Sequence, residues 1–301
     1  MKREQKRHKK NILTFDIEEW YLQKAYFGGK KEKYAEYDRY LDLLLNKLDK
    51  QGYKATFFCV GGMATDFPEV VRKIEGRGHE IGCHSFRHVW LNKMTEKEVL
   101  EDTRTAVDAL EQCIGKKVLS YRAPAFSIGN QNKWAFTALV ECGIMRDASI
   151  FPAERDFGGF PQFGKKVPTM VFSSDVAIKE FPICTTTLLG HEMAYSGGGY
   201  FRFFPLNYIR REMSKSDYNM TYFHIGDLVP ESSGVAGKGE YERYYKEPGT
   251  LKNRYMRYIK TNLGKKKAFD KLMKLLELES FVSLEQADAM MNWSEAPSVV
   301  L

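Results

Sequence analysis

Two histidines, His84 and His88, lie four residues apart in the segment HSFRH, directly after the short apolar run HEIGC. On a helical turn, side chains at this spacing meet on one side, with Cβ atoms about 5–6 Å apart. Two imidazole rings so placed suit one metal ion, whose third ligand is often a carboxylate. An ion held in this way keeps open positions that bind water and lower its pKa towards neutrality. The spacing therefore indicates a metal site of hydrolytic type.

Carboxylates for such a site are available where the first apolar run, NILTFDI (residues 11–17), ends. Asp16, Glu18 and Glu19 all lie there, and each is a candidate third ligand. Other polar side chains end or lie within later apolar runs, namely Arg122, Asp147 and His224. A single residue of this kind is ordinarily a surface charge or a satisfied loop residue. Their recurrence at one strand end after another favours an active site.

An alternation of short apolar runs with amphipathic helical patterns must position these residues. The first long helical pattern ends at Gly52, and a later one begins with the capping box Thr95 and Glu98 and ends at Gly115. About five strand–helix steps fill the first half of the chain, which predicts an α/β fold with a parallel sheet, closed into a barrel or near-barrel. The carboxyl ends of barrel strands meet on one face, where active sites lie.

The alternation breaks between residues 155 and 205, which are predicted to form an insertion of hairpins and loops. The segment 229–249 is rich in Gly, Ser, Glu and Tyr, and is predicted to be a long surface loop. We expect a basic N-terminal tail over residues 1–10, one domain over 11–292 and a C-terminal tail over 293–301.

The composition is that of a folded globular protein, with 301 residues, of which 43% are hydrophobic and 28% charged. The chain contains no run of 18 apolar residues and no apolar segment typical of a signal peptide. Its five cysteines are odd in number and lie mostly in apolar segments, which is typical of reduced thiols. Together these features predict a cytoplasmic protein.

The net charge of +7 has much of its excess in two lysine-rich runs, residues 2–10 and 265–267. Such runs are ordinarily solvated and differ from a basic face with interleaved aromatics, so no nucleic-acid partner is expected. A basic N-terminus is attracted weakly to anionic lipid headgroups, which makes peripheral association with the inner membrane a hypothesis. The sequence leaves the oligomeric state open.

Five motifs in this order resemble those of the polysaccharide deacetylase family, also called the NodB homology or carbohydrate esterase 4 type. They are TFDIEEW, HSFRH, RAPAF, RDASIFP and TYFH, and the resemblance covers roughly residues 10–230. The segments SGGGYFR (196–202) and FVSLEQ (281–286) are similar to the variant of bacterial exopolysaccharide and lipid-linked glycan biosynthesis clusters. The resemblance implies a distorted (β/α) barrel, often of seven parallel strands, and hydrolysis of an N-acetyl group from an amino sugar with release of acetate.

The same resemblance implies a catalytic role for four of the motif residues. Asp16 would be the general base, held charged and aimed by a bidentate pair with Arg122. His224 would be the general acid, with Asp147 orienting it and stabilising its imidazolium form.

A divalent metal, with zinc as the first choice, is implied as the cofactor, bound by Glu18, His84 and His88. Cobalt, nickel and manganese are alternatives, since several metals accept such a ligand set. The family usually has two adjacent aspartates at the first motif, whereas here Asp16 is followed by Ile and then two glutamates. Alternate residues of a strand share a face, so Glu18 is favoured as the ligand and Glu19 stays the alternative.

Substrate contacts are expected from three positions. The backbone N–H near Ala125 would complete an oxyanion site with the metal. Phe126 and Tyr200 are candidate stacking platforms for a sugar ring, although aromatic residues of this kind often lie in the core.

The predicted function is removal of N-acetyl groups from an amino sugar in a bacterial polysaccharide or its nucleotide- or lipid-linked precursor. Two alternatives stay open. One is metal-free hydrolysis of a cyclic amide, against which the retention of both histidines argues. The other is a non-catalytic glycan-binding protein of a polysaccharide assembly complex, against which the intact acid and base residues argue.

Overall fold

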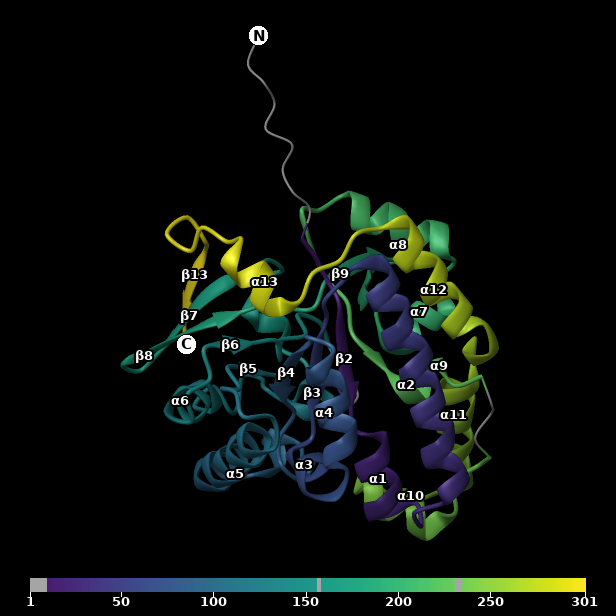
Figure 1. The fold of residues 1–301 in the computed structure, drawn as a ribbon. Helices are drawn as coiled ribbons and strands as arrows, with labels where there is room; N and C mark the ends of the chain where they lie inside the picture. The colour runs from purple at the N-terminus through teal and green to yellow at the C-terminus, as the bar shows by residue number, and fades with distance from the viewer. Residues whose placement is uncertain (1–9, 156–157, 231–233) are drawn as a thin grey trace.

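The computed structural model describes residues 10–155, 158–230 and 234–301, and its centre is a sheet of seven neighbouring parallel strands (Figure 1). In spatial order these are β12 (Phe223–His224), β2 (Thr14–Ile17), β3 (Thr56–Cys59), β4 (Glu80–Cys83), β5 (Ser120–Tyr121), β6 (Arg146–Asp147) and β8 (Val176–Glu180). The expected α/β fold with seven parallel strands is therefore confirmed.

Two further strands widen the sheet beyond β8. The strand β7 (Thr169–Ser173) runs antiparallel to β8, and β13 (Ser298–Val300) pairs in parallel with β7, so the predicted C-terminal tail includes a strand. A separate parallel pair, β1 (Lys10–Ile12) with β11 (Tyr218–Met220), precedes β2 and β12 along the chain. No ladder among the described residues joins β12 to β8, but the Tyr218 hydroxyl donates to the Pro182 carbonyl across this seam at 2.6 Å. The barrel is thus distorted rather than closed by a continuous ladder.

Burial explains why the strands have the continuous apolar sequences from which they were predicted. Every residue of β2 and β3 is buried, because helices cover the outer face of a parallel sheet while side chains fill its interior. Phe15 and Phe57 stack between these two strands with ring centroids 5.0 Å apart.

Helices of the first half lie mostly beside β3 to β6 and carry the predicted start and stop signals (Figure 1). The long helix α2 ends at Gly52 with φ of 68°, and α5 begins with the predicted Thr95–Glu98 capping box. The helices are α1 (Glu19–Tyr26), α2 (Lys31–Gln51), α3 (Gly61–Asp66), α4 (Pro68–Gly76), α5 (Glu96–Ile114) and α6 (Ala135–Glu141), with short 3₁₀ turns at Leu91–Lys93 and Pro124–Phe126.

The segment 155–205 contains two hairpins, β7–β8 and β9 (Thr185–Leu188) with β10 (His191–Ala194), and also a 3₁₀ turn, Pro161–Phe163. One strand of the first hairpin, β8, belongs to the parallel sheet. The helices that follow are α7 (Gly198–Phe203), α8 (Leu206–Ser214), α9 (Ile225–Leu228), α10 (Lys238–Tyr245), α11 (Leu251–Asn262), α12 (Ala268–Leu278) and α13 (Leu284–Ala289), with a 3₁₀ turn at Lys265–Lys267.

The prediction of a long loop over 229–249 is wrong, because α10 forms inside it. Glu240 accepts a hydrogen bond from the backbone N–H of Gly237, and the Tyr241 side chain is almost fully buried. Capping and one buried aromatic thus outweigh the unfavourable glycine at position 239. Residues 231–233 lie outside the described residues.

Two further observations bear on the sequence-based expectations. No helix in the described residues is long and apolar enough to cross a membrane. The five cysteines, at positions 59, 83, 113, 142 and 184, are all free. The basic run before residue 10 lies outside the described part of the chain.

Candidate active site

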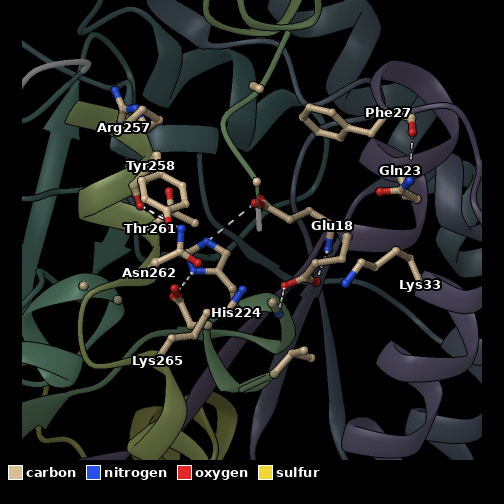
Figure 2. Close-up of a pocket in the computed structure, with 18 of the residues that line it drawn as sticks. Glu18, Gln23, Phe27, Lys33, His224, Arg257, Tyr258, Thr261, Asn262 and Lys265 are labelled. Carbon is tan, nitrogen blue, oxygen red and sulfur yellow. Dashed lines mark hydrogen bonds and ion pairs between the residues drawn. The ribbon is translucent and has the colours of Figure 1, made fainter. Parts of the chain in front are cut away.

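The carboxyl ends of four parallel strands bring the predicted residues together. Asp16 lies in β2, His84 follows β4, Arg122 follows β5 and His224 ends β12. Glu18 follows β2 at the start of α1, and Figure 2 shows Glu18 and His224 facing each other inside a cavity. This convergence is the consequence expected of parallel strands whose ends share one edge.

Glu18, His84 and His88 form a cluster that fits a metal ion. The Glu18 Oε2 atom lies 2.6 Å from His88 Nε2 and 3.4 Å from His84 Nε2. Each residue offers one ligand atom, and the three atoms lie within 4.8 Å of one another. Two imidazole nitrogens and one carboxylate oxygen suit a divalent transition metal that keeps open positions.

The hydrogen bonding of His84 supports this interpretation. Its Nδ1–H donates to the Arg122 carbonyl at 2.7 Å, which leaves the Nε2 lone pair directed at Glu18. A ligand histidine is typically fixed in this way by a backbone carbonyl on its other ring nitrogen.

The two histidines meet through an irregular loop, so the helical turn expected over residues 84–88 is wrong. Ser85 and His88 both have positive φ, near 60° and 57°. The loop is held by hydrogen bonds, since the Ser85 hydroxyl accepts from the His88 N–H and Asp102 of α5 accepts from the Phe86 N–H. The rings nevertheless approach to 5.2 Å between centroids, because the loop bends back on itself.

Asp16 and Arg122 form a fully buried ion pair. Arg122 Nη1 donates to Asp16 Oδ1 at 2.8 Å and to the Thr14 hydroxyl at 2.7 Å, while its Nε donates to the Ala148 carbonyl. Arg122 pairs with Asp16, as predicted. Only one nitrogen of its guanidinium contacts Asp16, so the predicted bidentate geometry is wrong. Three fixed acceptors and the Phe58 ring, 4.3 Å from the guanidinium, leave Arg122 little freedom.

Asp227 is the carboxylate that orients His224. Its Oδ2 atom lies 3.1 Å from His224 Nδ1, and its Oδ1 atom lies 3.0 Å from Arg202 Nη1. Burial opposes the imidazolium, but the charges of Glu18 and Asp227 outweigh it and raise the pKa of His224 to about 10. Burial would raise the pKa of Asp227, yet the hydrogen bond to His224 and the Arg202 charge keep it below its ordinary value.

The prediction that Asp147 orients His224 is therefore wrong. Asp147 accepts hydrogen bonds from both the hydroxyl and the N–H of Ser149, and its register partner across β6 and β8 is Glu180. Burial raises the pKa of both carboxyls, and the Asp147 charge adds to the shift of Glu180. Because the Ser149 hydroxyl in turn accepts from the Ala123 N–H, Asp147 supports the loop that follows β5.

The residues predicted to contact substrate separate into two groups. Tyr200 lines the cavity together with Tyr222 and Gly199. Phe126 is only 4% exposed and packs against Phe151 and Tyr222, so it is a core residue rather than a stacking platform. Ala125 adopts a positive φ of 54° beside it and does not line the cavity.

The cavity has a volume of about 690 Å³, and its walls come from both halves of the chain. Glu19 lines it beside Glu18 and accepts a hydrogen bond from the Gly226 N–H. Burial and the neighbouring Glu18 charge raise the pKa of Glu19 to about 7. Glu18 behaves in the opposite way, because the charges of His88 and His224 outweigh the effect of burial and hold its pKa well below the usual range.

Sequence reasoning missed Asp227 and the part of the cavity wall formed by α11. Asp227 follows His224 by three residues, and that spacing was the available signal, since i and i+3 are neighbours on a helical turn. The α11 residues belong to none of the five motifs, so no pattern pointed to them.

Comparison with known proteins agrees with this geometry. Residues 3–145 match the polysaccharide deacetylase family, and residues 148–289 match a domain family of unknown function, DUF3473. The first half of the chain therefore belongs to the polysaccharide deacetylase family.

Among curated proteins, a peptidoglycan-N-acetylglucosamine deacetylase of Bacillus cereus is 30% identical over 124 residues, which is 39% of this chain and 45% of that protein. A chitin deacetylase of Pestalotiopsis sp. is 33% identical over 91 residues, or 29% of this chain and 30% of that protein. The chain thus spans less than half the length of these relatives.

Among solved structures, a putative polysaccharide deacetylase from Mycobacterium smegmatis superposes with a TM-score of 0.64 at 16% identity. The superposition covers 98% of this chain and 94% of that one, so the two proteins share the fold over their whole length.

Proposed function

We propose that the protein is a metal-dependent hydrolase that removes N-acetyl groups from an amino-sugar glycan and releases acetate. The observation that carries the proposal is a set of linked contacts at the cavity. Glu18 lines the cavity and joins the buried His84 and His88 in one cluster, while His224 also lines it, pairs with Asp227 and lies 3.7 Å from Asp16 of the Asp16–Arg122 pair. The names of the curated relatives, which include peptidoglycan and chitin deacetylases, support the same substrate class.

The chain supplies a base and an acid in the places that amide hydrolysis needs. A divalent cation held by Glu18, His84 and His88, with zinc as our first choice, would polarise the amide carbonyl and lower the pKa of water. Asp16 is fixed by Arg122 and is positioned to accept the proton of the attacking water. General acid–base steps of this kind contribute roughly 10²–10⁴-fold to a rate.

His224 is the candidate acid for the leaving amine. Its Nε2 atom lies 3.7 Å from both Asp16 Oδ2 and Glu18 Oε1, so it faces the reaction centre from the side opposite Asp227. The Asp227 carboxylate at its Nδ1 atom favours the protonated ring, as a donor to an amine requires. Tyr200 and Tyr222 line the same cavity and are candidate contacts for the sugar ring.

Acetate release from N-acetylglucosamine oligomers tests the proposal directly. Wild type should release acetate, lose this activity on chelation and regain it on addition of zinc. His84→Ala should be folded by circular dichroism and inactive, while Leu189→Ser, a change at a 91% exposed position in the turn between β9 and β10, should match wild type. Full activity after exhaustive chelation would favour the metal-free alternative, and glycan binding without turnover would favour a non-catalytic role.

The cellular location and the carrier of the substrate are parts of the same proposal. We infer a cytoplasmic enzyme that acts at the inner membrane on a nucleotide- or lipid-linked precursor for exopolysaccharide synthesis. The support is the outward face of α11, where Leu251, Tyr255 and Ile259 are all more than 40% exposed and lysines flank them at positions 252 and 266. An amphipathic face of this composition suits an anionic lipid surface.

Vesicle sedimentation tests this location. The protein should bind anionic phospholipid vesicles better than neutral ones, and Tyr255→Ser combined with Ile259→Ser should weaken binding. Equal sedimentation of this variant and wild type would refute membrane contact through α11. A dimer in light scattering that the same variant dissociates would show instead that a second copy covers the face.

A further inference from the structure

The cavity has a polar wall far along the chain from the catalytic motifs. Arg254, Arg257, Tyr258, Thr261 and Asn262 of α11 all line it, at positions i, i+3, i+4, i+7 and i+8 of one helix. Figure 2 shows the side chains of Arg257, Tyr258, Thr261 and Asn262 grouped on one side of the cavity, with Lys265 below them and His224 beside them. A surface helix ordinarily directs its apolar stripe inward. Here the polar stripe faces inward, which indicates that it serves a ligand rather than the core.

The acidic side chains of the cavity are already engaged. Glu36 pairs with Lys33 at 2.8 Å, and Glu240 accepts the Gly237 N–H at the start of α10. Asp227 pairs with both His224 and Arg202. Glu18 belongs to the metal cluster, and Glu19 accepts a hydrogen bond from the Gly226 N–H. None of these contacts involves Arg254, although the charges of Asp227 and Glu36 act on Lys265.

Arg254 is left with unused hydrogen-bonding capacity, and Lys265 is a buried cation of the same cavity. Arg254 Nη1 donates to the Ala236 carbonyl at 3.1 Å, but its buried Nε–H has no acceptor in the described part of the chain. Lys265 is only 6% exposed, and burial lowers the pKa of its ammonium group against the opposing charge of Asp227. A buried donor without an acceptor is costly, and an anionic ligand group would remove that cost.

We propose that Arg254, Arg257 and Lys265 form a subsite for an anionic group of the substrate. The inference rests on the proposed function and narrows it, since the substrate becomes an amino-sugar compound that carries a carboxylate or a phosphate close to the acetylated sugar. Arg257 is well suited to this task because its guanidinium lies 4.6 Å from the centre of the Tyr245 ring, which restricts its orientation. Guanidinium groups bind both carboxylate and phosphate with two parallel hydrogen bonds.

Deacetylation kinetics on matched substrates test the subsite. The probes are neutral N-acetylglucosamine tetramer, an oligosaccharide of alternating N-acetylglucosamine and glucuronate, and UDP-N-acetylglucosamine. Arg254→Gln/Arg257→Gln should raise KM for the anionic substrate at least tenfold with little change in kcat, and should leave the neutral tetramer unaffected. The control, Lys252→Gln, changes a charge on the outer face of the same helix and should match wild type.

The outcomes distinguish an acidic sugar from a phosphate-linked precursor as the source of the anionic group. They also distinguish failure of the subsite from failure of the proposed deacetylase function. If KM of Arg254→Gln/Arg257→Gln rises only for the glucuronate oligomer, the anionic group is that of an acidic sugar. If KM rises only for UDP-N-acetylglucosamine, the substrate is a phosphate-linked precursor. Equal losses on neutral and anionic substrates, or none on either, would overturn the subsite. Arg254→Lys/Arg257→Lys should retain most of the anion preference, which a merely structural role would not predict.

Direct binding keeps the subsite testable if no substrate is turned over. Calorimetric titration of the wild-type protein with inorganic pyrophosphate and with glucuronate should show binding to at least one of them, weakened at least tenfold in Arg254→Gln/Arg257→Gln and reduced by salt. Binding without turnover would reject the proposed deacetylase and keep the subsite. Absence of binding to both probes would overturn the subsite.

Discussion

The two walls of the cavity are built in different ways. On one side, Glu18 and His224 line the cavity. Next to them the ends of parallel strands hold Asp16, His84 and Arg122, which are buried and tied to backbone carbonyls or to one another. On the other side, α11 contributes exposed or half-buried side chains, and none of its residues is fully buried. The first wall is fixed by the core of the barrel, whereas the second depends on one surface helix.

This difference separates chemistry from selectivity. Acid–base and metal chemistry requires side chains held within a few tenths of an ångström, which strand ends in a packed sheet provide. Selection among glycans requires charge and shape that vary without disturbing the core, which a surface helix provides. Changes in the first wall should therefore reduce turnover, and changes in the second should alter which substrate is preferred.

The largest effect is expected at Asp16. Asp16→Asn keeps the size of the side chain but removes the base and leaves Arg122 without its anionic partner. Acetate release should fall at least 10³-fold, and the bound metal should remain, because the ligand cluster is untouched. The measurement is single-turnover acetate release with metal analysis of the same samples. An Asp16→Asn protein within tenfold of wild type would contradict the role of Asp16 as base.

A smaller effect is expected at Asp227, the partner of His224. Asp227→Asn should lower the rate about 10²-fold and move the alkaline limb of the pH–kcat profile to lower pH. The sign follows from the charge, since the Asp227 carboxylate helps to raise the pKa of His224, and the acid must be protonated to act.

The matched control for Asp227 is Asp147→Asn. It should leave the position of the alkaline limb unchanged, because Asp147 contacts Ser149 and faces Glu180 rather than the catalytic histidine. A shift of the alkaline limb in Asp147→Asn, with none in Asp227→Asn, would restore the assignment predicted from the sequence.

The smallest effect is expected outside the cavity, at Glu180, and concerns stability. Burial raises the pKa of Glu180 in the folded state, so the folded protein binds more protons than the unfolded chain and loses stability as the pH rises above about 4.5. Each pH unit over which the two states differ costs about 1.4 kcal/mol. Glu180→Gln removes this titration, so its stability relative to wild type should increase from pH 5 to pH 8 in urea unfolding. A constant difference across this range would show that Glu180 is ionised in the folded protein.

The sequence was informative where chemistry depends on the strand pattern. Apolar runs predicted a parallel sheet, and the family resemblance implied its seven strands. The polar residues at the ends of these runs predicted the group formed by Asp16, Glu18, His84, Arg122 and His224. These predictions succeeded because a buried parallel strand has a continuous apolar sequence, and its end has a fixed place on the barrel.

The sequence was uninformative where position depends on tertiary contacts. The loop over 84–88 is held by Asp102 of α5, a residue outside the motif, so spacing alone suggested a helical turn that does not form. Asp147 occupies a strand end like the other site residues, but its side chain accepts hydrogen bonds from Ser149, and its register partner is Glu180 of β8, a strand assigned to the insertion. The α11 wall has no motif, because its function requires only a basic polar face directed into the cavity.

The most direct test of the account is the metal content of Glu18→Gln beside Glu19→Gln. The two residues are adjacent and equal in size, yet only Glu18 contacts both His84 and His88, while Glu19 accepts the Gly226 N–H. After zinc loading and desalting, elemental analysis should find one metal per chain in wild type and in Glu19→Gln, and little in Glu18→Gln. Metal retained by Glu18→Gln and lost from Glu19→Gln, or found in none of the three proteins, would contradict the account.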